Sequence, residues 1–344
     1  MSFDKEMKQI QSILGDGLVI IVGCGLSSAE GLPGMRALAD HLNKTITPIV
    51  PSEFSASWNK ISGLLTSGCG LEEVLSGRGL PDTVNSSIVL ETAKLILEAE
   101  GSVISEVLSG ERTLRFSNLL QALPPTPSEI TVLTTNYDRL IEVACEVNGL
   151  PVDSMFAGSS IGKFNRQESA YSFCRGIEKR QGKYVLKYTH RLKLFKPHGS
   201  LDWYQVNSKP IRCPYPINLP PLIIPPGETK YRVGYNEPFD AHREYANKAI
   251  DNAKRYLIIG YGFNDDHLQT HLERNLKGGK SCLLVSHSLS SNAVELMQEC
   301  SGFMALSADK KDDGLTCFHD VDGNVSMLDG EYWDLTNLVE GVLI

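Results

Sequence analysis

The chain has 344 residues, of which 42% are hydrophobic and 22% are charged, an ordinary composition for a globular protein. Its formal net charge of -8 disfavours direct, non-specific binding of nucleic acid. The eight cysteines form no Cys-x-x-Cys pair, which predicts free thiols in a reducing cytoplasm. We expect no signal segment, because residues 1–13 are polar and charged, and no membrane span, because no apolar run approaches about 20 residues.

Short apolar runs alternate with helical patterns along the chain. The strand predicted at residues 17–25 ends in a glycine turn, and a helical segment follows at 27–42. Ser27 and Glu30 in that segment have the spacing of a capping box at a helix start. Residues 55–122 keep a mostly helical periodicity, which predicts a helical module inserted after the first helix.

The same alternation continues to the end of the chain. The next predicted elements are a strand–turn–helix unit at 129–149, a polar loop at 158–182, a hairpin of 183–188 with 191–196, and a short or edge strand at 220–227. They are followed by a helix, a strand at 256–260 with a turn and a further helix, a second strand–turn–helix unit at 279–300, a last strand, and a tail at 310–344 with a strand-like piece and a terminal helix. Strands that alternate with helices predict an α/β fold, with a Rossmann-like parallel sheet flanked by helices and the helical module inserted into it.

Right-handed crossovers place the turns that follow parallel strands at one edge of the sheet. We therefore expect the turns at 23–28, 135–138, 260–266 and 286–292 to converge on one crevice.

The first glycine turn, Gly23-Cys24-Gly25, is compatible with a phosphate site, because two glycines after a strand let backbone N–H groups approach a pyrophosphate. It equally fits a tight turn without any ligand. A dinucleotide fingerprint would have a third small residue where Ser28 stands, and an acidic residue ending a strand about 20 residues on. Both are missing, which disfavours a hydride-transferring dehydrogenase.

Four motifs together resemble those of sirtuins, the Sir2 family. The string GCGLSSAEGLPGMR at 23–36 resembles the sirtuin GAGxSxxxGIPxFR, and TTNYD at 134–138 resembles TQNID. PHGS at 197–200 resembles the segment that carries the family's catalytic histidine, and IIGYGFND at 258–265 stands where sirtuins have a GTS strand end. The resemblance implies a sirtuin-like domain over residues 1–310, with the insertion at about 55–122, and a C-terminal extension at 311–344 that packs on the core.

Two departures refine the resemblance. Sirtuin deacylases carry a four-cysteine zinc module, but this chain has only Cys213 between residues 198 and 260, so no zinc-binding module is expected. The motif at 23–36 has Gly34-Met35 where the sirtuin pattern has Asp-Phe. In these features the chain resembles the zinc-free Sir2-like proteins of bacterial antiviral defence.

That resemblance implies an NAD+ glycohydrolase, which cleaves the nicotinamide–ribose bond to give nicotinamide and ADP-ribose. NAD is then the substrate, and no metal is required. It further implies a homo-oligomer and a protein partner, such as a HerA-type ATPase or another phage sensor.

The resemblance also implies roles for particular residues. Asn136 would position a water or a ribose hydroxyl, and His198 would act as general base on an exposed turn. The alternatives are that Asn136 caps a helix beginning at Tyr137 and that His198 is a loop histidine bonded to backbone. Asp138 would hold the nicotinamide carboxamide or stabilise a helix N-terminus. The residues expected to contact the dinucleotide are Gly23, Cys24, Gly25, Ser27, Ser28, Arg36, Asp138, Gly260, Tyr261, Gly262 and Ser286.

A competing site and three competing functions stay open. His267 and His271 have metal-ligand spacing on a helix, but Leu268 stands where H-E-x-x-H has its glutamate, so two surface or interface histidines are favoured. A protein deacylase or ADP-ribosyltransferase would need a lysine channel, which the zinc module usually frames. A non-catalytic NAD or ADP-ribose sensor could dispense with the Asn136–His198 pair, and a dehydrogenase ranks last.

Overall fold

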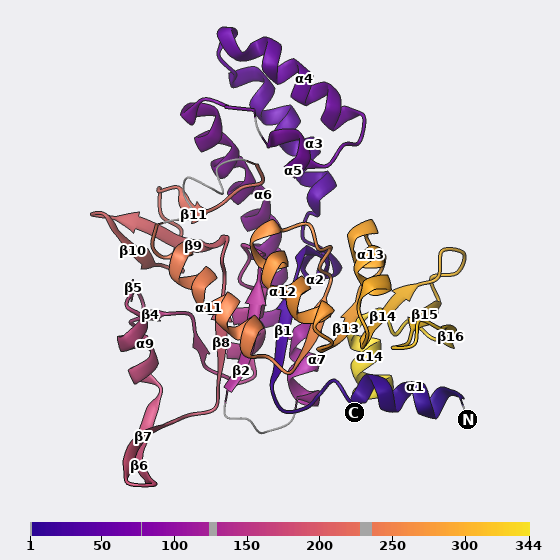
Figure 1. Cartoon of the computed structure of the whole chain (residues 1–344). Coiled ribbons are helices and arrows are strands. Elements are labelled where there is room, and N and C mark those ends of the chain that lie inside the picture. Colours follow the sequence, from indigo (N-terminus) through magenta and orange to yellow (C-terminus); the bar gives the residue numbers. More distant parts are fainter. Residues whose placement is uncertain (1, 77, 124–128, 228–235) are drawn as a thin grey trace.

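A large mixed sheet forms the centre of the computed structural model, which describes residues 2–76, 78–123, 129–227 and 236–344 (Figure 1). Among these residues the sheet has nine strands, in the order β16-β15-β14-β13-β12-β1-β2-β8-β3. They are β1 (Leu18–Val22), β2 (Glu129–Thr134), β3 (Val152–Asp153), β8 (Arg191–Phe195), β12 (Arg255–Ile259), β13 (Ser281–Val285), β14 (Phe303–Ala308), β15 (Leu315–His319) and β16 (Val325–Asp329). All neighbours from β14 to β3 pair in parallel, whereas β15 and β16 add an antiparallel edge. The predicted α/β class is confirmed.

Both faces of this sheet are covered by helices. Successive strand residues point to opposite faces, so Val19 and Ile21 of β1 enter one apolar cluster while Ile20 and Val22 enter the other. Burying each such side chain contributes about 1.5–3 kcal/mol. The helices α11 (Phe239–Asn252), α12 (Asp266–Lys277) and α13 (Ser291–Glu299) pack on the Val19 side, and α1 (Ser2–Gln11), α7 (Arg115–Ala122), α8 (Leu140–Val147), α14 (Leu335–Leu338) and η3 (Val339–Leu343) pack on the other.

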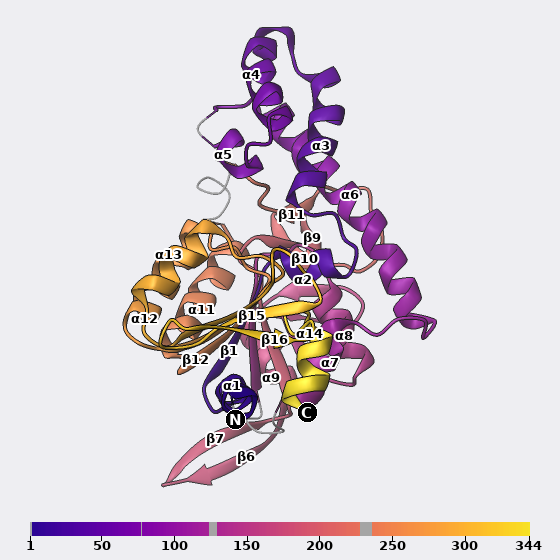
Figure 2. The same cartoon turned by 90° about the vertical axis from the view of Figure 1, so that its right-hand side faces the viewer.

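A helical lobe stands above the sheet edge where β1 ends (Figures 1 and 2). It consists of α3 (Met35–Ile46), η1 (Thr47–Ile49), η2 (Ser52–Phe54), α4 (Ser55–Thr66), α5 (Leu71–Leu75) and the first half of α6 (Asp82–Leu108). These helices bury a separate apolar core around Trp58. The predicted module at 55–122 is helical over α4 to α7, but the lobe core also includes α3, and α7 packs on the sheet. The predicted domain limits stay a proposal.

A smaller sheet and a projecting hairpin complete the structure. The smaller sheet has the order β11-β9-β10-β5-β4, formed by β4 (Phe156–Ala157), β5 (Gly162–Phe164), β9 (Gly199–Val206), β10 (Lys209–Arg212) and β11 (Pro221–Ile223). The edge position of β11 confirms the edge strand predicted at 220–227. Between β5 and β8 the chain forms α9 (Arg166–Ser172) and the hairpin β6 (Cys174–Arg180) with β7 (Lys183–Tyr188).

Two sequence predictions for this region are wrong. Residues 158–182 are not a loop, because they contain β5, α9 and β6. Residues 183–188 pair with β6, not with 191–196, and β8 lies between β2 and β3 in the central sheet. The physical reason is burial: Leu192 and Leu194 of β8 enter the main apolar cluster, whereas β7 stays largely exposed.

No helix among the described residues is long and apolar enough to cross a membrane.

Candidate functional site

A cavity of about 610 Å³ lies where β1, β2 and β12 end, beneath the helical lobe. Its volume falls in the range of small-molecule sites. The four predicted turns each contribute lining residues, among them Cys24, Thr135, Tyr261 and Asn292, so the expected convergence is confirmed. The lobe contributes α5 and the start of α3.

The described lining of the cavity is acidic. Glu72, Glu73, Asp138 and Asp265 line it, and no Lys or Arg is found among the described lining residues. The cavity therefore favours a ligand that carries positive charge on the part it buries.

Gly23 and Gly25 allow the turn after β1 to pack closely against the turn after β12. The Gly23 N–H donates to Ile259 O and the Gly25 N–H to Gly260 O, both at 2.9 Å. A Cβ on Gly23 would lie 2.5 Å from Gly260 O, and one on Gly25 would lie 2.6 Å from Gly260 Cα. Only glycine permits this approach, and Gly23, Gly25 and Gly260 do not themselves line the cavity. A phosphate contact by these three residues stays a prediction.

The capping box predicted for Ser27 is wrong. The helix α2 (Cys24–Ala29) starts three residues earlier, with Gly23 at the N-cap, and α3 begins separately at Met35. The Ser27 hydroxyl is therefore available for a long-range contact and donates to Asp138 Oδ2 at 2.6 Å.

Asn136 is fixed by a chain of hydrogen bonds. Its Nδ2 donates to Gly23 O at 2.9 Å and to Ser27 Oγ at 2.7 Å. A backbone carbonyl can only accept, so this contact settles which end of the amide faces Gly23. The two amide hydrogens are used, and Oδ1 is the group that Asn136 can offer to a ligand as an acceptor. Asn136 is buried and lines the cavity.

The helix after Asn136 starts later than expected. It begins at Leu140, and the N-cap is Arg139, so the alternative that Asn136 caps a helix starting at Tyr137 is wrong. Asp138 accepts the Leu140 N–H on Oδ1 at 3.2 Å, which confirms its alternative role at a helix N-terminus. Each Asp138 oxygen already accepts one hydrogen bond, and a contact with a carboxamide stays a prediction.

His198 lies between β8 and β9 and shares the cavity with Asn136. It is 7% exposed, so the expected exposed turn is wrong; the Ile224 N–H covers this segment by donating to His198 O. Its Nε2 lies 2.7 Å from Oδ2 of Asp265, in the turn after β12. A carboxylate beside an imidazole orients the ring, and an oriented imidazole suits a general base. The sequence showed Asp265 only as an acid after a strand and did not pair it with His198.

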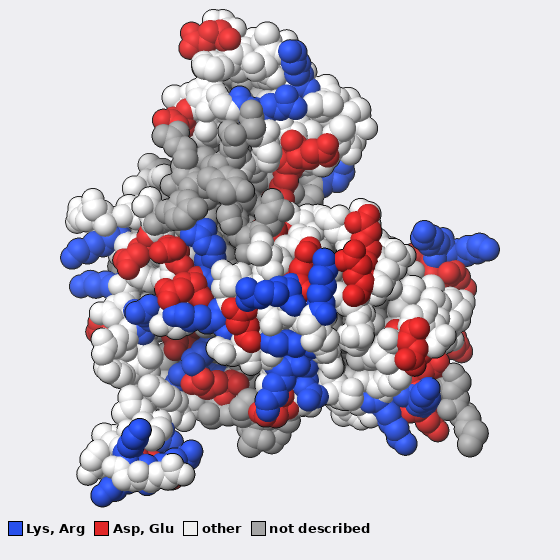
Figure 3. Space-filling model, viewed as in Figure 1, with Lys and Arg blue, Asp and Glu red and all other residues white. Residues whose placement is uncertain are grey.

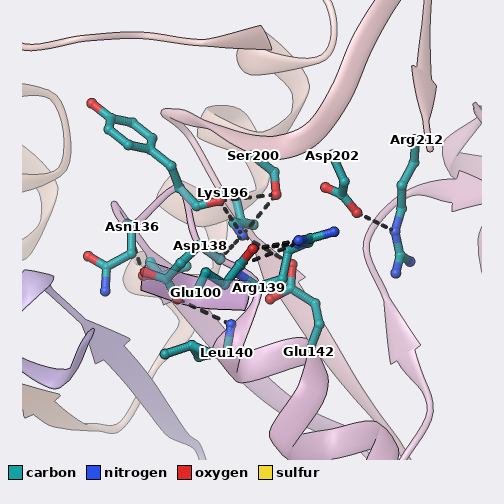
Figure 4. A network of polar contacts seen from close by, with 12 residues as sticks. Glu100, Asn136, Asp138, Arg139, Leu140, Glu142, Lys196, Ser200, Asp202 and Arg212 are labelled. Atoms are coloured by element: carbon teal, nitrogen blue, oxygen red, sulfur yellow. Dashed lines mark hydrogen bonds and ion pairs between the residues drawn. The ribbon is translucent and has the colours of Figure 1, made fainter. Parts of the chain in front are cut away.

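A buried lysine connects the end of β8 to the turn after β2 (Figure 4). The Lys196 ammonium is fully buried and donates to Asp138 O, and to Glu142 Oε1 and Ser200 Oγ at 3.1 Å each. Burial raises the pKa of the Glu142 carboxyl, although Lys196 opposes this. Because Lys196 stands two residues before His198 and binds the turn that carries Asn136, it fixes these turns relative to each other. Sequence reasoning missed this residue.

A second ion pair attaches the long helix α6 to the same turn (Figure 4). Glu100 is fully buried, accepts the Arg139 backbone N–H, and pairs with the Arg139 guanidinium. The lobe, which includes the first half of α6, is thereby connected to the turn carrying Asn136 and Asp138.

Other predicted contact residues divide into two groups. Cys24, Ser27, Tyr261 and Gly262 line the cavity. The residues that do not line it are Ser28, Arg36 and Ser286. Arg36 pairs instead with Asp40 on the lobe surface, and Ser286 Oγ donates to Ser288 O at 2.9 Å. For all of them, contact with a dinucleotide stays a prediction.

The predicted histidine pair is described only in part. The His267 side chain lies outside the described residues, while His271 Nδ1 lies 3.0 Å from Asp251 Oδ2. The described residues contain no group of three or more His, Cys, Asp or Glu side chains that could hold a metal ion.

Comparison with known proteins gives one family match. Residues 130–295 match the family model described as SIR2-like domain. The comparison with curated proteins gives no match. Residues 130–295 include Asn136, Asp138, His198 and Asp265.

Solved Sir2 structures are similar at low identity. A structure addressing the mechanism and regulation of Sir2 enzymes is 11% identical, covers 99% of this chain and 98% of its own, and has a TM-score of 0.44. A Sir2 mutant with a p53 peptide and NAD is 13% identical, covers 98% of this chain and 97% of its own, and has a TM-score of 0.42. A Sir2 homologue mutant with 2′-O-acetyl ADP-ribose is 14% identical, covers 99% of this chain and 97% of its own, and has a TM-score of 0.46. Such weak likenesses add nothing to what the strand order establishes, and the family match carries the conclusion: residues 130–295 of this chain are similar to a SIR2-like domain.

Proposed function

We propose that the chain is an NAD+ glycohydrolase that releases nicotinamide and ADP-ribose. The observation that carries the proposal is that the Asn136 amide and the His198–Asp265 pair line one cavity of about 610 Å³ at the sheet edge. The similarity of residues 130–295 to a SIR2-like domain suggests the substrate class.

In the proposed reaction, the bond between C1′ of the ribose and the nicotinamide nitrogen breaks, and its electron pair leaves with the nicotinamide. A water oxygen bonds to C1′, and the water gives up a proton to His198, which passes it to solvent. Asn136 Oδ1 accepts a hydrogen bond from the water or from a ribose hydroxyl and so orients it. General base help of this kind contributes about 10²–10⁴-fold to the rate.

The acidic lining supports this chemistry. The nicotinamide ring of NAD+ is cationic, and the ribose becomes oxocarbenium-like as the bond breaks. Fixed carboxylates such as Asp138 and Asp265 stabilise positive charge where it develops. The pyrophosphate carries negative charge, and we propose that backbone groups hold it away from these carboxylates.

Regulation and biological setting belong to the same proposal. NAD hydrolysis without restraint would be toxic, so we propose that a homo-oligomer or a partner controls it. The resemblance to zinc-free defence proteins suggests a cytoplasmic antiviral role beside a HerA-type ATPase or another phage sensor. The lobe forms one wall of the cavity, so its position controls access.

The test follows nicotinamide release from NAD+ by the full chain. We expect turnover by the wild-type protein, and a loss of at least about 10²-fold for His198→Ala and for Asn136→Ala. His287→Ala is the matched control, because His287 is 59% exposed and lies outside the cavity lining. Thermal unfolding with and without ADP-ribose shows that each variant folds and still binds.

Other outcomes would assign the other functions. If the chain binds NAD+ and never turns it over, alone or with its partner, it is a sensor. If an acylated peptide yields O-acyl-ADP-ribose, it is a deacylase. Turnover that is equal and high with and without the partner would contradict the regulated version of the proposal.

A further inference from the structure

The hairpin β6–β7, residues 174–188, projects from the lower end of the molecule (Figures 1 and 2). It forms a two-stranded sheet of its own, and we call it the arm. Its base is attached to the core, because the guanidinium of the buried Arg191 stacks 4.1 Å from the Tyr188 ring and 5.4 Å from the Phe173 ring. Because an isolated two-stranded hairpin is at best marginally stable in water, the exposed part of the arm needs a further contact.

The arm has an apolar face with nothing packed on it among the described residues. Ile177 pairs with Leu186 and Lys179 with Tyr184, so these four side chains share one face. Ile177 is 68% exposed and Tyr184 is 78% exposed. Apolar side chains gathered on a projecting element mark an interaction surface.

The arm is also strongly basic. Residues 174–188 contain five Lys or Arg and one Glu, a net charge of +4 on a chain whose total is -8. Figure 3 shows these basic side chains gathered on the arm at the lower left of the molecule. The arm therefore suits an acidic, partly apolar surface.

The chain itself carries such a surface. The hairpin β15–β16, residues 315–329, contains three Asp and no Lys or Arg, and β16 is the outermost strand of the large sheet. Val325 is 57% exposed and Met327 is 49% exposed, and they alternate with Ser326 so that they share a face with Asp329. The outer edge of β16 pairs with no other described strand. We call β15–β16 the acidic edge.

We infer that the arm of one copy docks on the acidic edge of a second copy of this chain, strand edge to strand edge. Open edges with matching apolar residues pair readily by strand addition. Opposite charges select this arrangement, since arm-to-arm contact would bring together two groups of +4. The arm and the acidic edge lie on opposite sides of the molecule (Figure 1), so the contact is head-to-tail and builds a ring or a filament. The inference does not depend on the proposed reaction.

The test is sedimentation velocity of the full chain and its variants over a range of protein concentration. We expect wild-type self-association that weakens as salt rises from about 0.05 to about 0.5 M, because salt screens exposed charges. The arm variant is Lys179→Glu with Arg180→Glu and Lys183→Glu. The edge variant is Asp322→Lys with Asp329→Lys. Each variant alone sediments as a monomer, and an equimolar mixture of the two associates again.

A matched control reverses three exposed lysines on the lobe instead, by Lys44→Glu, Lys60→Glu and Lys94→Glu. It changes the net charge as the arm variant does and leaves association unchanged. A wild-type chain that stays monomeric at its highest soluble concentration overturns the inference. Association that persists in the arm variant or in the edge variant also overturns the inference. Binding of a fluorescent single-stranded oligonucleotide by a monomeric chain, lost in the arm variant, would assign the arm to nucleic acid instead.

Discussion

Burial in the protein interior changes the pKa of His242 in α11. It is fully buried beside Trp203, with ring centroids 4.6 Å apart, and its Nδ1 accepts the Lys196 backbone N–H at 3.2 Å. Burial, with a smaller effect from the nearby Lys196 charge, lowers the pKa of His242 to about 3. The folded protein therefore keeps this imidazole neutral over a pH range in which the unfolded chain binds a proton.

This difference makes stability depend on pH. The pKa of His242 is about 6.5 in the unfolded chain and about 3 in the folded one, so its stabilising effect is complete above pH 6.5 and is lost as the pH falls toward 3. The loss is about 1.4 kcal/mol per pH unit. Between about pH 7 and pH 5, we expect urea unfolding to show that the wild type loses about 2 kcal/mol more than His242→Gln. His287→Gln should keep the wild-type pH dependence; equal slopes in all three proteins would contradict the assignment.

Single residues also show what sequence motifs can reveal. Asn136 and His198 line one cavity, and the sequence predicts a shared site for them because each belongs to a short local motif. Asp265 and Lys196 were missed in their roles, because those roles arise only when the turn after β12 and the end of β8 meet the turn after β2. The spacing of residues along the chain does not show that these three segments lie next to each other in the fold.

The helix α6 is the element that links the lobe to the site. Glu100, in its second half, is the buried partner of Arg139 in the turn before α8. Removing one member of a buried pair leaves a charge without compensation, which costs more than the pair itself contributes.

We therefore expect Glu100→Ala to lower the free energy of unfolding by about 3–5 kcal/mol. It should also lower nicotinamide release, because the turn carrying Asn136 loses an anchor. Glu98→Ala, at an exposed position on the same helix, should change stability by no more than about 0.5 kcal/mol. Urea unfolding of the two variants decides the matter, and a similar small effect for both would show that the pair is dispensable.

Elements were predictable where local pattern and tertiary pairing agree. The strands β1, β2, β12 and β13 are apolar runs that end in turns, and the structure contains them as expected. The hairpin predicted at 183–196 failed because β7 and β8 have similar alternating patterns but different partners. Alternation fixes which side a residue faces, and it does not fix which strand lies alongside.

At the scale of the whole molecule, the lobe and the sheet have separate apolar cores. Trp58 lies at the centre of the lobe core, whereas β1 lies between the two clusters that cover the sheet. Separate cores can open separately, and the free energy of opening is lower for the smaller core, which here is that of the lobe.

Hydrogen exchange measures this directly. We expect amides of α4 to exchange through a local opening, with a lower free energy than amides of β1, which should report global unfolding. If α4 and β1 gave the same free energy of opening, the lobe and sheet would unfold as one unit and the expectation would be wrong.

The glycine contact beneath the cavity has a consequence for which ligands the site accepts. Gly23, Gly25 and Gly260 touch backbone to backbone, so the turns after β1 and β12, which carry lining residues of the cavity, are packed against each other without room for adjustment. The roof of the cavity comes from α5 and the start of α3, which belong to the separately packed lobe. We therefore expect discrimination between two ligands of similar chemistry to depend on the roof, because its side chains can change without moving these turns. Redesigning residues there would change which molecule fits and leave the groups that act on it untouched.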